Sequence, residues 1–232
     1  IDYVFDTNFS ADLTILEEGT EFLHRLGKNG PFPLITSCSP GWIKFGETYF
    51  PELTENISSC KSPQQMMGAL IKTYFAESRG IAPEDIVSLS IMPCTAKKFE
   101  AARPEMKASG YRDVDYVLTT REIARMIKQA GLRFPDLEEV LPDPVLSSYN
   151  GAATIFGATG GVMEAALRTA YEIHTGKSLE TLEFAAIRGI EGVKEAEIDA
   201  GGTPVRVAVA HGLANARTLL SRVREEKKKG NV

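Results

Sequence analysis

Residues 91–100 read IMPCTAKKFE, and residues 36–42 read TSCSPGW. Each stretch sets a cysteine within two positions of a proline, directly after a short apolar run. Proline fixes its own φ and disfavours helical geometry in the residue before it, so the chain is held open where it leaves each run. We therefore expect Cys38 and Cys94 to be positioned thiols on turns, and Lys97 follows the second of them by three residues.

The apolar runs before the two cysteines are predicted strands. Residues 85–91 are rich in valine, leucine and isoleucine, as expected of a buried parallel strand. Other predicted strands are 3–5, 33–36, 115–118, 184–187, 193–198 and 205–210, and the predicted helices are 11–26, 40–50, 63–80, 120–130, 162–175 and 215–228. This order predicts an α/β fold with mostly parallel sheets flanked by helices, and the last two strands predict a small β-hairpin near the C-terminus.

Local signals mark several helix starts. Asn8 or Ser10 is a candidate N-cap for the first helix, and Pro40 suits the first position of the second. Ser62-Pro63-Gln64-Gln65 has the spacing of a capping box, with the proline at the first helical position. Residues 132–149 are proline-rich and lack a clear period, so they are predicted to form a long loop with at most one short helix.

The composition is that of a soluble globular protein, because 43% of the 232 residues are hydrophobic and 25% are charged. The net charge of −5 argues against nucleic acid as a partner, and no apolar run approaches the ~18 residues of a membrane span. Three cysteines cannot form a paired disulfide framework, which favours a cytoplasmic location. The chain begins without methionine inside an apolar segment, so we expect a piece of a longer protein.

Taken alone, the two cysteine turns favour a metal–sulfur or redox site slightly over a nucleophile. Both follow predicted parallel strands, where α/β folds place their sites, and Lys97 supplies positive charge for a thiolate. Cys60 lacks such a setting and is expected to be an ordinary free thiol. The glycine-rich turn at 156–161 fits a cofactor at a helix N-terminus and close helix packing equally well. Glu18, Glu21 and Arg25 share one helix face, which by itself indicates a solvated surface with ion pairs.

The motifs resemble one family closely. TSCSPGW resembles the first cluster motif of the iron-only (di-iron) hydrogenases, TSCCPxW, and MPCTAKKFE at 92–100 matches the second, MPCxxKxxE, at every fixed position. SPQQ at 62–65 and FGATGGVMEAA at 156–166 also look like stretches of that family. The resemblance covers essentially the whole chain and implies a catalytic domain that interconverts hydrogen with protons and electrons.

The resemblance implies a cofactor, the H-cluster, in which a 4Fe-4S cubane is bridged to a di-iron unit carrying carbon monoxide, cyanide and a dithiolate amine. Soft thiolates suit such clusters, and Cys94 would be a cubane ligand. Lys97 would donate a hydrogen bond to a cyanide. The residues that would line the pocket are Met92, Pro93, Gln64 and Phe156.

The resemblance also changes the interpretation of the acidic helix face. The family passes protons from a cysteine through glutamate, serine, glutamate and arginine to the surface, and the matching residues here are Cys38, Glu18, Ser58, Glu21 and Arg25. One departure affects this assignment. An ungapped match makes Cys38 the relay thiol and places Ser39 at a cubane-ligand position. The alternatives are that Cys38 binds the cubane in its place, and the relay loses its thiol, or that a cluster here is labile.

A second departure concerns the extent of the chain. The family's third cluster motif, with two further cysteines, would follow residue 232, and an N-terminal ferredoxin-like segment would precede residue 1. Residues 1–232 are therefore expected to be a partial catalytic domain of two packed α/β lobes, with an approximate boundary near residues 110–150.

The implied partners are hydrogen and protons, together with ferredoxin or NAD- and flavin-linked subunits within a larger subunit or hetero-oligomer. Further Fe–S clusters are expected outside this chain. The alternative function is a non-catalytic relative, either a hydrogen sensor or an Fe–S assembly factor. A purely structural α/β domain would leave the two cysteine turns unexplained.

Overall fold

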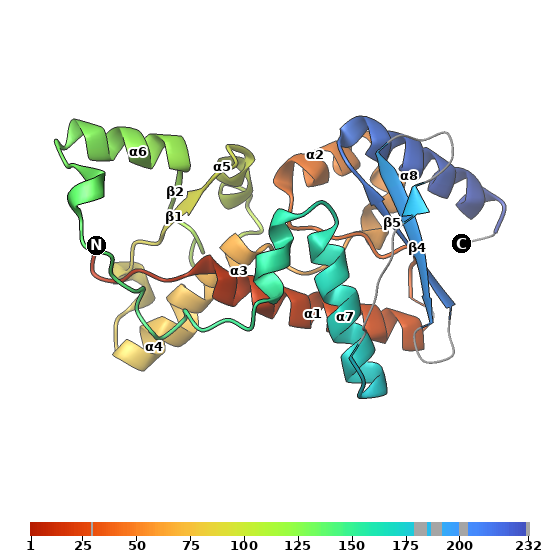
Figure 1. The fold of residues 1–232 in the computed structure, drawn as a ribbon, viewed down its shortest axis with the longest axis horizontal. Helices are drawn as coiled ribbons and strands as arrows, with labels where there is room; N and C mark the ends of the chain where they lie inside the picture. Colours follow the sequence, from red (N-terminus) through yellow and green to blue (C-terminus); the bar gives the residue numbers. More distant parts are fainter. Residues whose placement is uncertain (29, 179–184, 187–191, 200–203, 231–232) are drawn as a thin grey trace. The chain divides into compact units, whose positions relative to one another are not determined.

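The computed structural model describes residues 1–28, 30–178, 185–186, 192–199 and 204–230. The chain forms two compact units (Figure 1). The first unit contains Ile1–Leu13 and Lys61–Tyr149, and the second contains Thr14–Cys60 and Asn150–Val232. The chain thus passes between the units three times, and each unit is described separately.

The N-terminal helix α1 (Thr7–Gly27) begins earlier than the sequence predicts. The carboxylate of Asp6 accepts a hydrogen bond from the amide of Asn8 at 2.9 Å, so Asp6 takes the capping role expected of Asn8 or Ser10. The strand expected at residues 3–5 is wrong. The backbone of Val4 instead exchanges hydrogen bonds with Asp143, donating to its carboxylate at 2.7 Å and accepting from its amide at 2.8 Å.

The first unit contains one nearly continuous helical rod. It consists of α3 (Pro63–Leu70), a π-helical turn η2 (Ile71–Phe75) and α4 (Ala76–Arg79). The rod ends at Gly80, whose φ of 63° is left-handed, so a residue without Cβ suits this position. Pro63 is the first residue of α3, and Ser62 is its N-cap, accepting a hydrogen bond from the amide of Gln65 at 3.4 Å. The predicted start and end of this helix are confirmed.

A two-stranded parallel sheet is formed by residues that follow this rod in the sequence. Strand β1 (Leu89–Met92) pairs with β2 (Tyr116–Thr119) in the register Leu89 to Tyr116 through Met92 to Thr119. The remaining elements of the unit are η3 (Pro83–Asp85), α5 (Ala96–Ala101), α6 (Thr120–Gln129) and η4 (Phe134–Asp136). Two small cores hold the unit together, one around Met67, Phe75 and Leu146 and the other around Ala101, Val114 and Val117.

Gly68 sets how closely α3 approaches the segment before β2. A Cβ atom at this position would lie 2.5 Å from the carbonyl oxygen of Asp113 and 2.6 Å from a methyl group of Val114. Because backbone atoms cannot move aside as a flexible side chain can, only glycine fits here without displacing the helix.

The second unit combines helices with an antiparallel sheet. Its elements are α2 (Pro40–Tyr49), η1 (Pro51–Asn56), η5 (Ala152–Gly157), α7 (Gly161–Thr175), β3 (Ala185–Ala186), β4 (Val193–Asp199), β5 (Pro204–Ala210) and α8 (Leu213–Lys228). Strand β4 lies between β3 and β5 and pairs with both in antiparallel fashion. Pro40 is the first residue of α2, as predicted. The strand expected at 33–36 is reduced to one parallel bridge between Ile35 and Ile57.

Helix α8 packs against α2 and η1 through its arginines. The guanidinium of Arg217 lies 4.4 Å from the ring centroid of Tyr49, and that of Arg224 lies 4.4 Å from that of Phe50. Arg224 also donates to the carbonyl oxygen of Tyr49 at 2.9 Å. Leu220 completes the core with Phe50 and Leu53.

The α/β class and the C-terminal hairpin are confirmed. Parallel pairing occurs in β1–β2 and in the Ile35–Ile57 bridge, whereas β3–β5 are antiparallel. The hairpin turn at 200–203 and the outer residues of the strand predicted at 184–187 lie outside the described residues. No helix within the described part of the chain is both long and apolar enough to cross a membrane.

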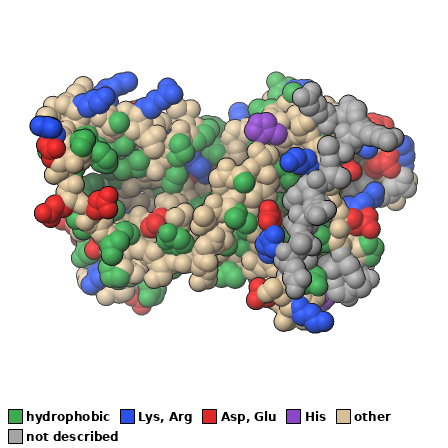
Figure 2. Space-filling model, in the orientation of Figure 1, with side chains coloured by type: hydrophobic (Ala, Val, Ile, Leu, Met, Phe, Trp, Pro, Cys, Tyr) green, Lys and Arg blue, Asp and Glu red, His purple; other side chains and the backbone are tan. Residues whose placement is uncertain are grey.

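The first unit carries large apolar side chains on its surface (Figure 2). Val140 and Leu141, after η4, are 85% and 89% exposed, and Val87 and Tyr116 are 69% and 63% exposed.

Candidate functional site

Cys94 lies on the turn between β1 and α5, as the sequence predicts. Met92 ends β1 and is half-buried, and Pro93 and Cys94 are exposed. The carbonyl oxygen of Cys94 accepts a hydrogen bond from the amide of Lys97 at 3.2 Å. The thiol is therefore held at the end of a strand and is accessible.

A buried carboxylate, Glu100, holds the ammonium group of Lys97. The Nζ atom of Lys97 lies 3.1 Å from both carboxylate oxygens of Glu100. The same carboxylate accepts hydrogen bonds from the hydroxyl of Ser62 at 2.8 Å and from Nε2 of Gln64 at 3.1 Å. Glu100 is only 4% exposed, so this charge-assisted pair is shielded from solvent. Lys97 is thus fixed one turn of chain from Cys94.

Ser90 on β1 orients the amide of Gln64. Its hydroxyl donates to Oε1 of Gln64 at 2.8 Å, which turns Nε2 toward Glu100 and toward the carbonyl oxygen of Lys97, 3.2 Å away. Gln64 is 2% exposed and is therefore part of this network. We call Lys97, Glu100, Ser62, Gln64 and Ser90 the Glu100 network.

The other cysteine turn lies in the second unit. Ser39 occupies the N-cap position of α2, yet its hydroxyl makes no capping hydrogen bond and the residue is exposed. The turn is held by its neighbours, because Trp42 donates from Nε1 to the carbonyl oxygen of Thr36 at 3.1 Å and Ser37 donates to that of Cys60 at 2.6 Å. Cys38 is half-buried.

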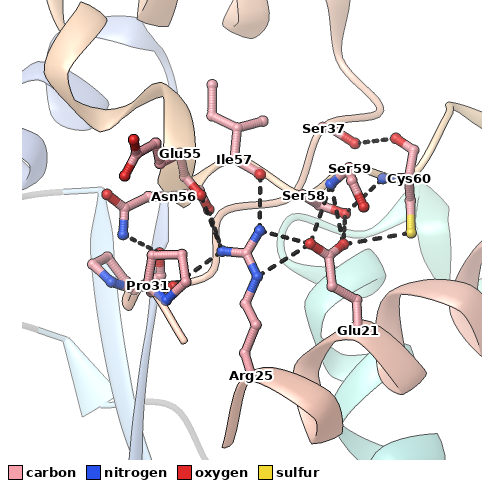
Figure 3. A network of polar contacts seen from close by, with 11 residues as sticks. Glu21, Arg25, Pro31, Ser37, Glu55, Asn56, Ile57, Ser58, Ser59 and Cys60 are labelled. Atoms are coloured by element: carbon pink, nitrogen blue, oxygen red, sulfur yellow. Dashed lines mark hydrogen bonds and ion pairs between the residues drawn. The ribbon is translucent and has the colours of Figure 1, made fainter. Parts of the chain in front are cut away.

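The carboxylate of Glu21 on α1 accepts hydrogen bonds from residues of α1 and of the loop after η1 (Figure 3). Arg25 donates to it from Nε at 3.1 Å and from Nη2 at 2.6 Å, and Ser58 donates its hydroxyl at 2.7 Å. The Oε2 atom of Glu21, which accepts from Ser58, also accepts from the amide of Ser59 at 3.1 Å and from the thiol of Cys60 at 3.6 Å. Burial acts to raise the pKa of Glu21, but the hydrogen bonds from Ser58, Arg25 and Ser59 outweigh it and lower the pKa.

The guanidinium of Arg25 is enclosed by backbone carbonyls. Its Nη1 atom donates to Pro31 at 3.0 Å and to Glu55 and Asn56 at 3.3 Å, and Nη2 donates to Ile57 at 3.1 Å (Figure 3). We call Glu21, Arg25, Ser58, Ser59 and Cys60 the Glu21 network.

Gly30 allows the backbone to pack closely against the aliphatic part of the Arg25 side chain. A Cβ atom at position 30 would lie 3.0 Å from Cα, Cβ and Cγ of Arg25. The arginine is therefore confined from this side as well as by the carbonyls.

Glu18 lies one turn before Glu21 on α1 and is buried, at 2% exposure. Neither of its carboxyl oxygens has a hydrogen-bond partner among the described residues. Burial raises its pKa from 4.5 to about 7; Ser58 and the backbone of Ser37 act in the opposite direction, and the negative charge of Glu21 raises it further. Glu18 can therefore gain or lose a proton near neutral pH.

Cys60 belongs to the Glu21 network, which the sequence did not predict. It was expected to be an ordinary thiol, but its amide donates to the hydroxyl of Ser58 at 3.1 Å and its thiol faces Glu21. Burial and the neighbouring carboxylates Glu18 and Glu21 raise the pKa of Cys60 to about 12, so it stays a neutral donor. The only sequence signal is its position two residues after Ser58, the spacing of a serine turn.

An open hollow of about 440 Å³ adjoins the Glu21 network. Its lining includes Glu17, Thr20, Glu21, His24, Arg25 and Cys60. Solvent therefore has access to one side of the Glu21 carboxylate.

The structure places the predicted residues in two groups. Lys97 and Gln64 share the Glu100 network, and Lys97 follows Cys94 by three residues. Glu21, Ser58 and Arg25 share the Glu21 network. Phe156 lies on η5 and is half-buried. Among the described residues, no three histidine, cysteine or acidic side chains meet in a way that could hold a metal ion.

Comparison with known proteins identifies the family. The family model described as "Iron only hydrogenase large subunit, C-terminal domain" matches residues 1–232. The chain belongs to this family.

Individual relatives agree with this assignment. The chain is 55% identical over 212 residues to the periplasmic Fe hydrogenase large subunit of Nitratidesulfovibrio vulgaris, covering 90% of this chain and 50% of that protein. It is 52% identical over 225 residues to the NADP-reducing hydrogenase subunit HndD of Solidesulfovibrio fructosivorans, covering 94% and 38% respectively. It is also 33% identical over 238 residues to the cytosolic Fe-S cluster assembly factor narfl of Xenopus tropicalis, covering 97% and 49%.

A solved structure shows the same fold. The apo form of a variant of the FeFe-hydrogenase HydA1 from Chlamydomonas reinhardtii matches with a TM-score of 0.83 and 42% identity, covering 98% of this chain and 65% of that one. The chain spans half or less of the length of these curated relatives.

Proposed function

We propose that this chain is the core of a hydrogenase catalytic domain that interconverts hydrogen with two protons and two electrons. The observation that carries the proposal is the Glu21 network beside the buried Glu18. It combines a carboxyl group whose pKa is about 7 with a hydroxyl and a second carboxylate that are hydrogen-bonded to each other. A carboxyl group such as Glu18, whose pKa lies near the working pH, transfers protons efficiently.

The proton relay would run through Cys38, Glu18, Ser58 and Glu21, with Arg25 at its outer end. The serine hydroxyl passes a proton without changing its own charge, because it accepts one proton as it donates another. It donates to Glu21 at 2.7 Å and acts to lower the pKa of Glu18.

The H-cluster is the cofactor that the family implies, and the residues in the first unit fit it. Cys94 presents an exposed thiol at a strand end, and Lys97 presents an ammonium group held by Glu100. A thiolate suits an iron–sulfur cluster, and an ammonium suits an anionic cyanide. When bound, the cofactor supplies the redox chemistry at iron. Met92, Pro93, Gln64 and Phe156 would line its pocket.

Ser39 would be the second cubane ligand supplied by this chain. Its exposed hydroxyl is not engaged in capping α2, although serine favours that role. The helix N-terminus favours a negatively charged ligand atom at this position. The alternative, in which Cys38 binds the cubane, would remove the thiol from the relay.

Partners and location are part of the same proposal. Hydrogen and protons would be the substrates, and ferredoxin or NAD- and flavin-linked subunits would exchange electrons through further Fe–S clusters. Exposed apolar side chains such as Val140 and Leu141 support contact with additional polypeptide. We propose the cytoplasm as the location because Cys38, Cys60 and Cys94 form no disulfide, although one relative is named as periplasmic.

Reconstitution of the full-length protein tests the proposal. After loading with the cluster and the di-iron unit, we expect hydrogen evolution from a reduced dye and infrared bands of bound carbon monoxide and cyanide. Cys94→Ala should lose cluster iron together with activity. Glu18→Gln and Glu21→Gln should each lower turnover by about a hundredfold or more at unchanged iron content. Near-normal turnover in both glutamine variants would contradict the relay.

The second candidate is a non-catalytic Fe–S assembly factor or hydrogen sensor. Ser39 favours it, because a hydroxyl is a weaker iron ligand than a thiol, and so does the 33% identity to an assembly factor. Cluster binding without any hydrogen evolution in the loaded full-length protein would support this candidate. Measuring the cluster iron content of Ser39→Cys against the parent tests the role of residue 39. If residue 39 is a cubane ligand, the cysteine variant should hold the cluster more tightly than the parent, because a thiolate is the better iron ligand.

A further inference from the structure

The carboxamide of Gln64 is bound at both ends by groups of the protein. Its Nε2 atom carries two N–H groups and lies 3.1 Å from Oε2 of Glu100 and 3.2 Å from the carbonyl oxygen of Lys97. At the other end, Oε1 accepts the hydroxyl proton of Ser90 at 2.8 Å. The acceptors around Nε2 thus equal its N–H groups in number, so Gln64 uses its donor capacity within the protein.

The surrounding groups admit one orientation of this carboxamide. A carboxylate and a backbone carbonyl can only accept hydrogen bonds, so the reversed carboxamide would place its oxygen against the oxygens of Glu100 and Lys97. Gln64 and Glu100 are buried, so little water can offset such a repulsion. The hydroxyl of Ser90 can donate or accept, and it donates here because its partner is the carboxamide oxygen. Ser90 therefore holds the oxygen end while the two acceptors hold the nitrogen end.

In this orientation Gln64 holds Lys97 at two points. One N–H group binds the main chain of Lys97 at the start of α5, and the other binds the carboxylate that pairs with the ammonium group of the same lysine. Gln64 lies on α3 and Ser90 lies on β1. Residues of two other elements thus determine where the side chain of Lys97 lies.

We propose that Gln64 is a positioning residue for Lys97, held in its orientation by Ser90, and that it donates no hydrogen bond to the group bound in the pocket. This assignment rests on the proposed function and refines it, because Gln64 would line the pocket without acting as a donor there. A cyanide ligand only accepts hydrogen bonds. Of Gln64, Ser90 and Lys97, the residue that supplies its donor is therefore Lys97, through its ammonium group.

The first test measures access to Lys97 in the full-length protein before it is loaded with the di-iron unit. The protein is treated with acetic anhydride at a fixed pH, and mass spectrometry gives the rate of acetylation at Lys97. Gln64→Met keeps the length of the side chain but removes its hydrogen bonds, so the pair with Glu100 should loosen and the rate should rise about tenfold. Gln65→Met is the matched control and should leave the rate unchanged. Gln65 is the adjacent residue, is also buried, and has no side-chain partner among the described residues.

Ser90→Ala is a milder variant for the same measurement, because it removes one hydrogen bond from the carboxamide oxygen and leaves Gln64 in place. The rate of acetylation at Lys97 should rise about fivefold. Ser90→Thr keeps a hydroxyl and should restore the rate of the parent. Rates equal to that of the parent in both Gln64→Met and Ser90→Ala would overturn the positioning role.

The second test asks whether Gln64 donates to the bound group itself. In the loaded full-length protein, the infrared bands of cyanide and carbon monoxide are compared among the parent, Gln64→Met, Lys97→Met and the double variant. If Gln64 acts only through Lys97, Gln64→Met should shift the bands of the parent and leave those of Lys97→Met unshifted. Equal shifts in both backgrounds would show that Gln64 is itself a donor and would overturn the proposal. A protein that cannot be loaded would contradict the proposed function, whereas the acetylation rates would still decide the role of Gln64.

Discussion

The Glu100 and Glu21 networks are built from the same kinds of groups but differ in their access to solvent. Each centres on a carboxylate that accepts hydrogen bonds from a cation and a serine hydroxyl. The side chains of Glu100 and Lys97 are 5% and 12% exposed, whereas Glu21 is 15% exposed and borders an open hollow. The Glu100 network is closed to solvent and holds a charge in a fixed place. The Glu21 network is open to solvent and can exchange a proton. The following predictions test this difference, in order of decreasing effect.

Removing the charge of Glu100 should have the largest effect on stability. Glu100→Gln leaves the Lys97 ammonium without its counter-charge in a shielded site, so the free energy of unfolding should fall by about 3 kcal/mol or more. Urea denaturation measures the change. The double variant Lys97→Met/Glu100→Gln should recover much of the loss. Equal losses in the single and double variants would show that the ion pair is not the cause.

Glu18 should make stability depend on pH. Its pKa in the folded protein is about 7, against 4.5 ordinarily, so between these values the folded state binds more protons than the unfolded state. The free energy of unfolding contributed by this group therefore falls as pH rises through that window, by about 3 kcal/mol in total. Glu18→Gln should lack this dependence.

Denaturation at pH 4.5, 6 and 7.5 gives the difference between the parent and Glu18→Gln. Glu17→Gln, at the exposed neighbouring position, is the control. A parent–variant difference that stays constant with pH would mean that Glu18 does not titrate near neutrality.

Arg25→Met should cost less than the change at Glu100. It removes donors from Glu21 and from the carbonyls of 31 and 55–57, but the adjoining hollow lets water replace part of them. We expect a loss of about 2 kcal/mol in the free energy of unfolding. Lys28→Met, which also lines the hollow, should leave stability nearly unchanged. A loss larger than that of Glu100→Gln would contradict the contrast between the closed and open networks.

Ser90→Ala should have the smallest effect. It removes one hydrogen bond to Gln64 Oε1, at a cost of about 1 kcal/mol. Thr73→Ala, whose exposed hydroxyl donates to the carbonyl oxygen of Ala69 on the same helical rod, is the control in the same unit. No change at Ser90 would indicate that Gln64 is oriented by Glu100 alone.

The features predicted correctly from the sequence are those that depend on residues close to one another in the chain. The prolines at the starts of α2 and α3, the Ser62 cap and the C-terminal hairpin all follow from local geometry. The strand predicted at 3–5 fails because the partner of Val4 is Asp143, which no local pattern reveals. The capping box also remains incomplete, because the side chain of Gln65 finds no partner among the described residues while the hydroxyl of Ser62 donates to Glu100.

The candidate site shows the same limit. The resemblance supplied Glu18, Ser58, Glu21 and Arg25, but no pattern in the sequence shows that Cys60 faces a carboxylate 39 positions away. The Glu100 network joins residues 62, 64, 90, 97 and 100 from three elements. The chain also passes between its two units three times, which requires knowledge of contacts distant in sequence.

The close approach at Gly68 has a consequence for how this protein can change over generations. Gly68 lies one turn after Gln64 on α3, and the lack of a side chain there fixes the spacing of that helix from Asp113. Any larger residue would shift the helix that carries Gln64 toward or away from Glu100. In a randomised library selected for folded protein with an intact Lys97 environment, position 68 should return only glycine, while exposed Tyr74 on the same rod varies freely. Mutational tolerance around Lys97 is thus limited by a residue that does not contact it.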